Sequence, residues 1–362
     1  MASQWTGAAP PPPGVEPNFV DPISHDRGNI ALHTVCIILV TLSVAMRLYT
    51  RIYITKIKVD IDDYLCILSY CLTVSFSGLM FKCYSKGIGR HIWDTPALWI
   101  FEALKYFTIA TYIYILCAAS IKLTFLFFYR RLFSIQSSAR YFINSGIIFV
   151  LCLNLGLFFA TLFSCTPVER EWDTTVPGHC IDPVILPWLS GASSSATDIY
   201  VLVLPIPLVW NLKMGIRYKL KVLAVFSIGA FSCAASLVRL GATPILHSSH
   251  DATWNLSYIS LWATLEVNVG IICACLMLLP AFLDRHFPTK TKSFLSRLWS
   301  RIICFSYKRT KGETDYSFRS DQNSWTHYQY TIKSESLNVV HSEPDNNILH
   351  TRQFNLTEES TL

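Results

Sequence analysis

Seven long apolar stretches separated by short polar connections constrain the fold of this chain more than any other feature. They lie at residues 30–50, 62–82, 98–128, 141–165, 183–210, 221–243 and 258–283. Each is long enough for an α-helix that crosses the hydrocarbon core of a bilayer, which takes roughly 20 residues. Only 15% of the residues are charged, against about 25% in a typical soluble domain. The sequence therefore predicts an all-α membrane protein, a bundle of seven transmembrane helices.

The distribution of Lys and Arg among the connections predicts the orientation of this bundle. Cytoplasmic connections carry an excess of basic residues. The first, third and fifth connections hold eleven, and the second, fourth and sixth hold four. We therefore expect the N-terminus outside the cell and the C-terminus in the cytoplasm. No basic patch accompanies a fold that reads nucleic acid, so the partner expected from composition is the lipid bilayer and not nucleic acid.

Polar segments flank the predicted bundle at residues 30–283. Residues 1–29 are Pro-rich and lack the apolar region of a signal peptide, so we expect an extracellular tail. Residues 284–311 place apolar residues at helical spacing between basic ones, which predicts an amphipathic helix on the anionic inner leaflet. Cys304 in this segment is either a palmitoylation site or an unmodified thiol. Residues 312–362 are rich in Ser, Thr and Asn, which predicts a disordered cytoplasmic tail.

Ionisable side chains inside the apolar stretches need an explanation, because each costs about 2.5–3.5 kcal/mol at the centre of a membrane helix. The third, fifth, sixth and seventh stretches contribute Lys122, Asp198, Arg239 and Glu266, and the seventh also holds Asn268. We expect them to form a polar cluster in the bundle interior that binds a ligand or gates a conformational change. Static pairing that fixes helix packing is the alternative.

The outer side of the predicted bundle carries two candidate covalent modifications. Cys165 and Cys180 flank the connection between the fourth and fifth stretches, and the oxidising exterior permits a bridge between them. Pairing of either residue with Cys83 is the alternative. Asn255 opens an Asn-Leu-Ser sequon and is a candidate glycosylation site. Such a sequon on the outer face, together with the basic tail, makes the plasma membrane the expected location.

Pro205 and Pro207 interrupt the fifth apolar stretch. Each removes a backbone donor and bends a helix. The pair predicts either a hinge or a fixed bend.

Several specific chemistries find no support in the sequence. Retinal bound as a Schiff base needs a Lys in the seventh stretch, and residues 258–283 contain none. Only His33 lies inside an apolar stretch, so an intramembrane zinc site is not expected and we assign no metal ligand. The sequence lacks HExxH, GxSxG and P-loop motifs, so no catalytic residue is assigned. No internal repeat marks a transporter, although an ion pathway through the four charged residues stays an alternative.

Several motifs occur in a fixed order along the bundle. They are Asp62-Asp63-Tyr64, the segment from Gly87 to Asp94, the segment from Lys122 to Arg131, Cys165 to Asp173 with Gly178 to Cys180, Thr197 to Tyr200 before Leu204 to Pro207, Phe226 with Gly229, Phe231 and Arg239, and Glu266 to Cys275. With these motifs the chain resembles the fungal rhodopsin-domain integral membrane proteins, a family that includes Pth-eleven-type receptor-like proteins and satratoxin-cluster membrane proteins. The resemblance covers roughly residues 30–285.

This resemblance implies a seven-helix protein similar to G-protein-coupled receptors. The leading hypothesis is a receptor for an outer small-molecule or surface ligand, whose binding shifts the bundle between two packings. Tyr129, Arg130 and Arg131 are then candidate cytoplasmic contacts for a heterotrimeric G protein. An enzyme or transporter of a secondary-metabolite gene cluster is the alternative, and a non-signalling scaffold is a third.

Overall fold

The computed structural model describes residues 7–56, 58–133, 137–173, 175–182, 185–206, 216–244 and 251–286. The side chains of residues 216–228 lie outside this description. The chain divides into two compact units, residues 1–291 and residues 292–362. All described residues belong to the first unit, so the predicted tail at 312–362, Cys304 and Pro207 lie outside the described residues.

Seven helices of 19 or more residues run through the described part of the chain. They are α1 (Asp26–Tyr49), α2 (Ile61–Ser85), α3 (Ala97–Leu132), α4 (Ser137–Leu162), α5 (Ile185–Val203), α7 (Ile216–Ala242) and α9 (Ala252–Leu276). Five of them, α1, α2, α3, α4 and α9, are long and apolar enough to cross a membrane. The prediction of a mostly helical membrane fold is therefore confirmed.

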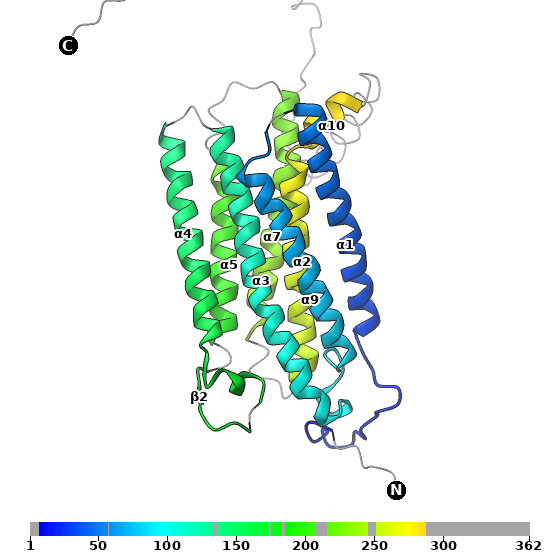
Figure 1. Cartoon of the computed structure of the whole chain (residues 1–362). Coiled ribbons are helices and arrows are strands. Elements are labelled where there is room, and N and C mark those ends of the chain that lie inside the picture. The colour runs from blue at the N-terminus through cyan, green and yellow to red at the C-terminus, as the bar shows by residue number, and fades with distance from the viewer. Residues whose placement is uncertain are drawn as a thin grey trace, which may run out of the picture. The chain divides into compact units, whose positions relative to one another are not determined.

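The long helices run side by side as a bundle (Figure 1), and their contacts form a closed ring. Each helix contacts the next one along the chain, and α9 closes the ring by packing on α1. Helix α3, the longest at 36 residues, also contacts α5 and α9 across the bundle. Helices α3 and α9 are accordingly more buried than α1, α2 and α4. Charged residues on these two helices can therefore meet partners from several directions.

Helix boundaries follow local chemistry. Asp60 caps the N-terminus of α2 in a capping box with Asp63, which satisfies backbone donors that would otherwise lack partners. Helix α1 continues as a π-helical turn, η1 (Thr50–Thr55). Helix α5 ends at Val203, and helical structure resumes at Pro205 and Ile206 after a turn at Leu204, because Pro205 has no N–H to continue the hydrogen-bond ladder. The predicted boundary at residue 210 lies outside the described residues.

The C-terminal end of the bundle differs from the predicted boundary at residue 283. Helix α9 ends at Leu276, and a separate short helix, α10 (Leu279–His286), follows it. Phe282 of α10 contacts the rings of Tyr49 and His286. The predicted amphipathic segment at 284–311 overlaps the last residues of α10, and its remainder lies outside the described residues.

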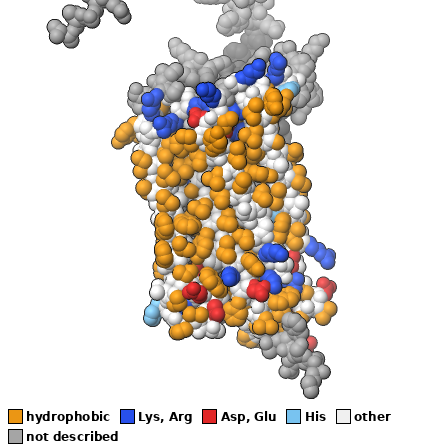
Figure 2. Space-filling view, in the orientation of Figure 1, with side chains coloured by type: hydrophobic (Ala, Val, Ile, Leu, Met, Phe, Trp, Pro, Cys, Tyr) orange, Lys and Arg blue, Asp and Glu red, His pale blue; other side chains and the backbone are white. Residues whose placement is uncertain are grey.

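The face of the bundle shown in Figure 2 is apolar over its middle, and charged side chains gather at its two ends. Large exposed hydrophobic side chains include Ile38, Leu42, Phe149 and Leu155. Such a band would be a liability in water but matches the hydrocarbon core of a bilayer.

One end of the bundle is covered by non-helical segments. The residues before α1 run along the α2–α3 connection, with Ala8 N bonding Thr95 O and His25 N bonding Gly89 O. That connection contains the short helix η2 (Ile92–Asp94). Gly87 has a positive φ of 101°, and a Cβ there would lie 2.5 Å from the Thr95 side chain. A glycine is therefore required at this first position of the Gly87–Asp94 motif.

The α4–α5 connection covers the same end (Figure 1). It contains a two-residue strand β1 (Cys165–Thr166), the helix η3 (Val168–Glu171) and a second strand β2 (His179–Cys180). The strands pair antiparallel, with Cys165 opposite Cys180. We refer to residues 163–182 as the outer loop.

Candidate functional site

The four charged residues singled out from the sequence meet in the bundle interior. Lys122 comes from α3, Asp198 from α5, Arg239 from α7 and Glu266 from α9. They form two ion pairs, Arg239 Nε with Glu266 Oε2 at 3.0 Å and Lys122 Nζ with Asp198 Oδ1 at 3.3 Å. Lys122, Arg239 and Glu266 are buried and the Asp198 side chain is 14% exposed, and each pair carries no net charge. This arrangement makes charges tolerable where water is absent.

Glu266 is the most heavily bonded member of the network. Its Oε1 accepts hydrogen bonds from the Tyr114 hydroxyl at 2.9 Å and the Ser194 hydroxyl at 2.6 Å, and its Oε2 faces Arg239. The Arg239 guanidinium also lies over the Tyr114 ring, 5.0 Å from the centroid. One carboxylate thus links α3, α5, α7 and α9.

Ser194 connects the two ion pairs. Its hydroxyl accepts a 2.8 Å hydrogen bond from Lys122 Nζ while donating to Glu266. On the other side, the Ser236 hydroxyl donates to Asp198 Oδ2 at 2.5 Å. The network is therefore continuous, so a movement at Glu266 can be transmitted to Lys122 and Asp198.

Sequence reasoning did not single out the hydroxyl partners Tyr114, Ser194 and Ser236. Ser and Tyr are common in membrane helices, and a single occurrence gives no signal. For Ser194 the spacing gives a weak signal, since Ser194 and Asp198 lie four residues apart on one face of α5.

Asn268 does not belong to the described contacts of this network. Its Nδ2 donates to the Thr264 carbonyl on the same helix at 2.7 Å. Its Oδ1 is buried and has no hydrogen-bond partner among the described residues.

A cavity of about 480 Å³ separates the network from the outer loop. Tyr114 and Arg239 line its inner end, and Cys165, Glu171 and Cys180 line its outer end. Most of the remaining wall is hydrocarbon from α2, α3, α5 and α9, including Phe76, Met80, Phe107, Leu186 and Ile259. Ligand cavities of drug-sized molecules measure about 300–1,000 Å³ and have such apolar walls with a few polar groups.

A disulfide between Cys165 and Cys180 fixes the outer loop over this cavity. The predicted pairing is thus present, and the alternative partner Cys83 is a buried free thiol. Glu171 in the same loop accepts a hydrogen bond from the Tyr112 hydroxyl at 2.7 Å. Burial raises the pKa of the Glu171 carboxyl above its ordinary value, which favours its uncharged form.

Asn255 lies in the first turn of α9. Its side-chain nitrogen, the atom that would carry a glycan, is buried. Ser257 of the same sequon is also buried and accepts a hydrogen bond from Asn29 Nδ2 at 2.7 Å. Glycosylation of Asn255 stays a prediction, and in this conformation the helix does not present the acceptor nitrogen.

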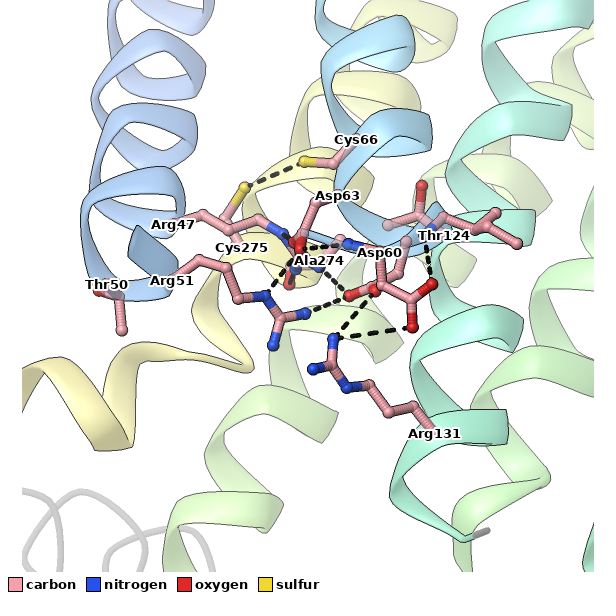
Figure 3. A network of polar contacts seen from close by, with 12 residues as sticks. Arg47, Thr50, Arg51, Asp60, Asp63, Cys66, Thr124, Arg131, Ala274 and Cys275 are labelled. Atoms are coloured by element: carbon pink, nitrogen blue, oxygen red, sulfur yellow. Dashed lines mark hydrogen bonds and ion pairs between the residues drawn. The ribbon is translucent and has the colours of Figure 1, made fainter. Parts of the chain in front are cut away.

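A second charged cluster lies near the end of the bundle that carries α10 (Figure 3). Arg47 of α1 and Arg51 of η1 share the carboxylates of Asp62 and Asp63 at the start of α2. Both Arg Nη2 atoms lie 2.6 Å from Asp62 Oδ2, and the Nε atoms of Arg47 and Arg51 lie 3.1 and 2.7 Å from Asp63. All four side chains are buried. We call these four residues the Arg–Asp cluster.

The Arg–Asp cluster also joins α1 and α2 to α9 and α3. Arg47 Nη1 donates to the Ala274 carbonyl at 2.7 Å, and Arg131 Nη1 of α3 lies 3.5 Å from Asp62 Oδ1. The eleven basic residues counted in the odd-numbered connections included Arg47 and Arg51 of the first connection. The structure corrects this, because both are paired inside the bundle. A sequence signal for this pairing was present, because two Arg residues four positions apart precede two adjacent Asp residues at the start of an apolar helix.

The three candidate cytoplasmic contacts differ in accessibility. Arg130 is exposed. Arg131 is partly buried by its ion pair with Asp62. Tyr129 is buried in the core, so this conformation does not offer its side chain to a protein partner.

Within the described residues, no group of three or more His, Cys, Asp or Glu side chains is arranged to hold a metal ion.

The helical bundle, its apolar surface and its buried charges define a multi-pass membrane protein with a ligand-sized cavity. The fungal rhodopsin domain matches residues 46–285, and the chain belongs to that family. The resemblance stated from the motifs is thereby confirmed.

Three fungal relatives are similar to this chain. It is 35% identical over 182 residues to a SAT4 family membrane protein of Emericella nidulans, covering 50% of this chain and 46% of the relative. It is 27% identical to the polyenoic acids biosynthesis gene cluster protein Ba17b of Metarhizium anisopliae, covering 68% and 71%. It is 24% identical to the receptor GIN3 of Arthrobotrys oligospora, covering 75% and 66%.

The match to the Emericella nidulans protein thus spans less than half of that relative's length. No solved structure matches the chain.

Proposed function

We propose that this protein is a seven-span receptor that binds a small molecule in the cavity between the outer loop and the buried charge network. The observation that carries the proposal is the position of Arg239. It lines the cavity and at the same time pairs with Glu266, which links four helices. A ligand that forms a hydrogen bond with Arg239 changes the ion pair between Arg239 and Glu266. That change can shift the packing of α3, α5, α7 and α9.

The orientation with the N-terminus outside has two supports. The disulfide lies in the outer loop, at the end of the bundle where the described chain begins (Figure 1), and disulfides persist in oxidising compartments. Removing the buried Arg47 and Arg51 from the count leaves nine basic residues in the odd-numbered connections against four in the others, so the excess on the inner side persists. The plasma membrane is the proposed location.

A heterotrimeric G protein is the proposed partner at the inner end. Arg130 is available there, and Arg131 would become available if its contact with Asp62 opened. The name of the relative GIN3, a receptor, favours a receptor function for this chain.

A second candidate function is a membrane enzyme or transporter in the biosynthesis of a secondary metabolite. It is favoured by the printed name of the relative Ba17b, a gene-cluster protein. In that case Asp198→Ala or Glu266→Ala abolishes a product at normal protein levels.

A gene deletion distinguishes the two candidates when untargeted metabolite profiles and transcript responses to surface and chemical cues are recorded together. The receptor predicts loss of a cue response while the metabolite profile in the absence of the cue is intact. Loss of one compound family with every cue response intact would contradict the receptor and support the biosynthetic role.

Coupling is tested separately on purified protein. The receptor predicts nucleotide-sensitive binding to a Gα subunit of the same fungus. Absence of such binding to every Gα subunit of that fungus would remove the G protein from the proposal.

A further inference from the structure

The shape and chemistry of the cavity restrict the class of ligand it can hold. Its walls are mostly side chains such as Phe76, Met80, Phe107, Leu186 and Ile259, and its volume is about 480 Å³. Burial of an apolar ligand against such walls gains roughly 25 cal/mol for each Å² of apolar surface removed from water. The body of the ligand is therefore apolar.

The charges at the inner end of the cavity already balance. Lys122 and Arg239 are opposed by Asp198 and Glu266, and none of these four side chains is more than 14% exposed. A ligand with a formal charge placed against Arg239 would leave one uncompensated charge in this region, and an isolated buried charge is costly. An uncharged ligand avoids that cost.

Arg239 nevertheless has unused hydrogen-bonding capacity. Its Nε donates to Glu266, whereas its Nη2 is buried and has no hydrogen-bond partner among the described residues. A buried donor without an acceptor costs about 1–3 kcal/mol, and more when the donor is charged. A neutral oxygen acceptor that reaches the guanidinium removes this cost without adding charge.

The charged groups at the outer end have other contacts. Arg170 donates to the Val176 carbonyl, and Glu171 is bonded by Tyr112. Two lining side chains have a buried polar atom without a hydrogen-bond partner among the described residues, Ser164 Oγ and Arg239 Nη2, and of these only Arg239 is charged.

We propose that the cavity binds an uncharged, largely apolar small molecule whose carbonyl oxygen accepts a hydrogen bond from Arg239. This inference rests on the proposed function for one point only, namely that the cavity is the ligand site. It holds equally for a receptor and for a transporter.

Direct binding to the purified full-length protein in lipid nanodiscs tests this class. The probes are two hydrocarbon skeletons, a medium-length alkane and ethylnaphthalene, each compared with its methyl ketone and its carboxylate. The Ile259→Trp variant supplies the background, because the larger indole obstructs part of the cavity and leaves partition into lipid unchanged. Tyr258→Trp is the matched control, since Tyr258 is the neighbouring residue and is exposed on the bundle surface.

For at least one skeleton the ketone should bind about tenfold or more tightly than the hydrocarbon and the carboxylate, as expected for a hydrogen bond to a charged donor. Arg239→Lys keeps a cation beside Glu266 but removes the guanidinium Nη2 that would donate to the ligand. It should remove the preference for the ketone and retain hydrocarbon binding. If that variant does not fold, the paired Arg239→Met and Glu266→Gln substitutions remove both charges and make the same prediction.

Tightest binding of the carboxylates, equal binding of all three forms, no binding above the Ile259→Trp background, or a ketone preference that survives without Arg239 would each overturn the proposal. These outcomes are independent of signalling. A protein that binds the ketone through Arg239 but whose deletion leaves every cue response intact keeps this site and loses the receptor function.

Discussion

Arg239 on α7 and Glu266 on α9 form an ion pair at the inner end of the cavity, with 3.0 Å between Arg239 Nε and Glu266 Oε2. Both side chains are almost fully enclosed by the bundle. Because Glu266 also bonds Tyr114 and Ser194, this pair is the point where the cavity meets the contacts between helices.

Glu266→Gln should destabilise the protein strongly, because it leaves the Arg239 cation buried without its carboxylate. Removal of one partner from a buried pair costs about 3–5 kcal/mol. Apparent melting temperatures in detergent would show a large decrease for Glu266→Gln and a partial recovery when Arg239→Gln is added. Simple addition of the two single effects would contradict the pairing.

The Arg–Asp cluster gives a second prediction about stability. Asp63→Asn leaves Arg47 and Arg51 short of one carboxylate inside the bundle, so we expect a loss of about 3–5 kcal/mol. Asp60→Asn is the matched control, because Asp60 is more than half exposed and Asn caps a helix as well as Asp does. Thermal unfolding of the two variants side by side measures the difference. Equal effects would mean that the cluster contributes no more than a surface pair.

The disulfide of the outer loop should stabilise the cavity end of the bundle. The bridge closes a loop with a sequence separation of 15, for which chain entropy predicts about 3 kcal/mol. Cys165→Ser and Cys180→Ser should therefore each lower the apparent melting temperature, whereas Cys152→Ser, at an exposed free thiol, should not. Mild reduction should destabilise the wild type and Cys152→Ser, which keep the bridge, but not Cys165→Ser or Cys180→Ser. A wild type that is insensitive to reductant would contradict this role.

The buried Glu171 carboxyl should make the stability of the folded protein depend on pH. Burial raises its pKa in the folded state above the ordinary value of 4.5, so the folded protein binds this proton more tightly than the unfolded chain does. The resulting stabilisation is fully present below pH 4.5 and is lost as the pH rises through the folded-state pKa.

Glu171→Gln stays uncharged at every pH and is the comparison for this effect. The stability of Glu171→Gln relative to wild type should therefore rise with pH above 4.5 and then level off. Melting curves of the two proteins over a pH series provide the measurement. A relative stability that falls as the pH rises would show that the folded protein favours the charged form.

The sequence predicted the helical framework because transmembrane helices are specified locally, by length and apolarity. It also predicted the meeting of Lys122, Asp198, Arg239 and Glu266, since buried charges must find partners. The disulfide was predicted because Cys165 and Cys180 flank one connection on the side of the bundle expected to face the oxidising exterior.

The Arg–Asp cluster and the cavity were not predicted. Arg47 and Arg51 follow an apolar stretch, where basic residues ordinarily mark the cytoplasmic boundary, and only the packing of α1 on α2 and α9 reveals that they are buried. The cavity depends on which faces of α2, α3, α5 and α9 converge under the outer loop. Sequence periodicity carries no information on that convergence.

Complementation of the deletion strain with cavity variants tests the central claim most directly. Wild type, Ile259→Trp and Tyr258→Trp are expressed at equal membrane levels, and the transcript response to the cue lost in the deletion strain is measured. The account predicts that Tyr258→Trp restores the response and that Ile259→Trp, which obstructs the cavity, does not. Full restoration by Ile259→Trp would show that the cavity is not the site at which the cue is bound.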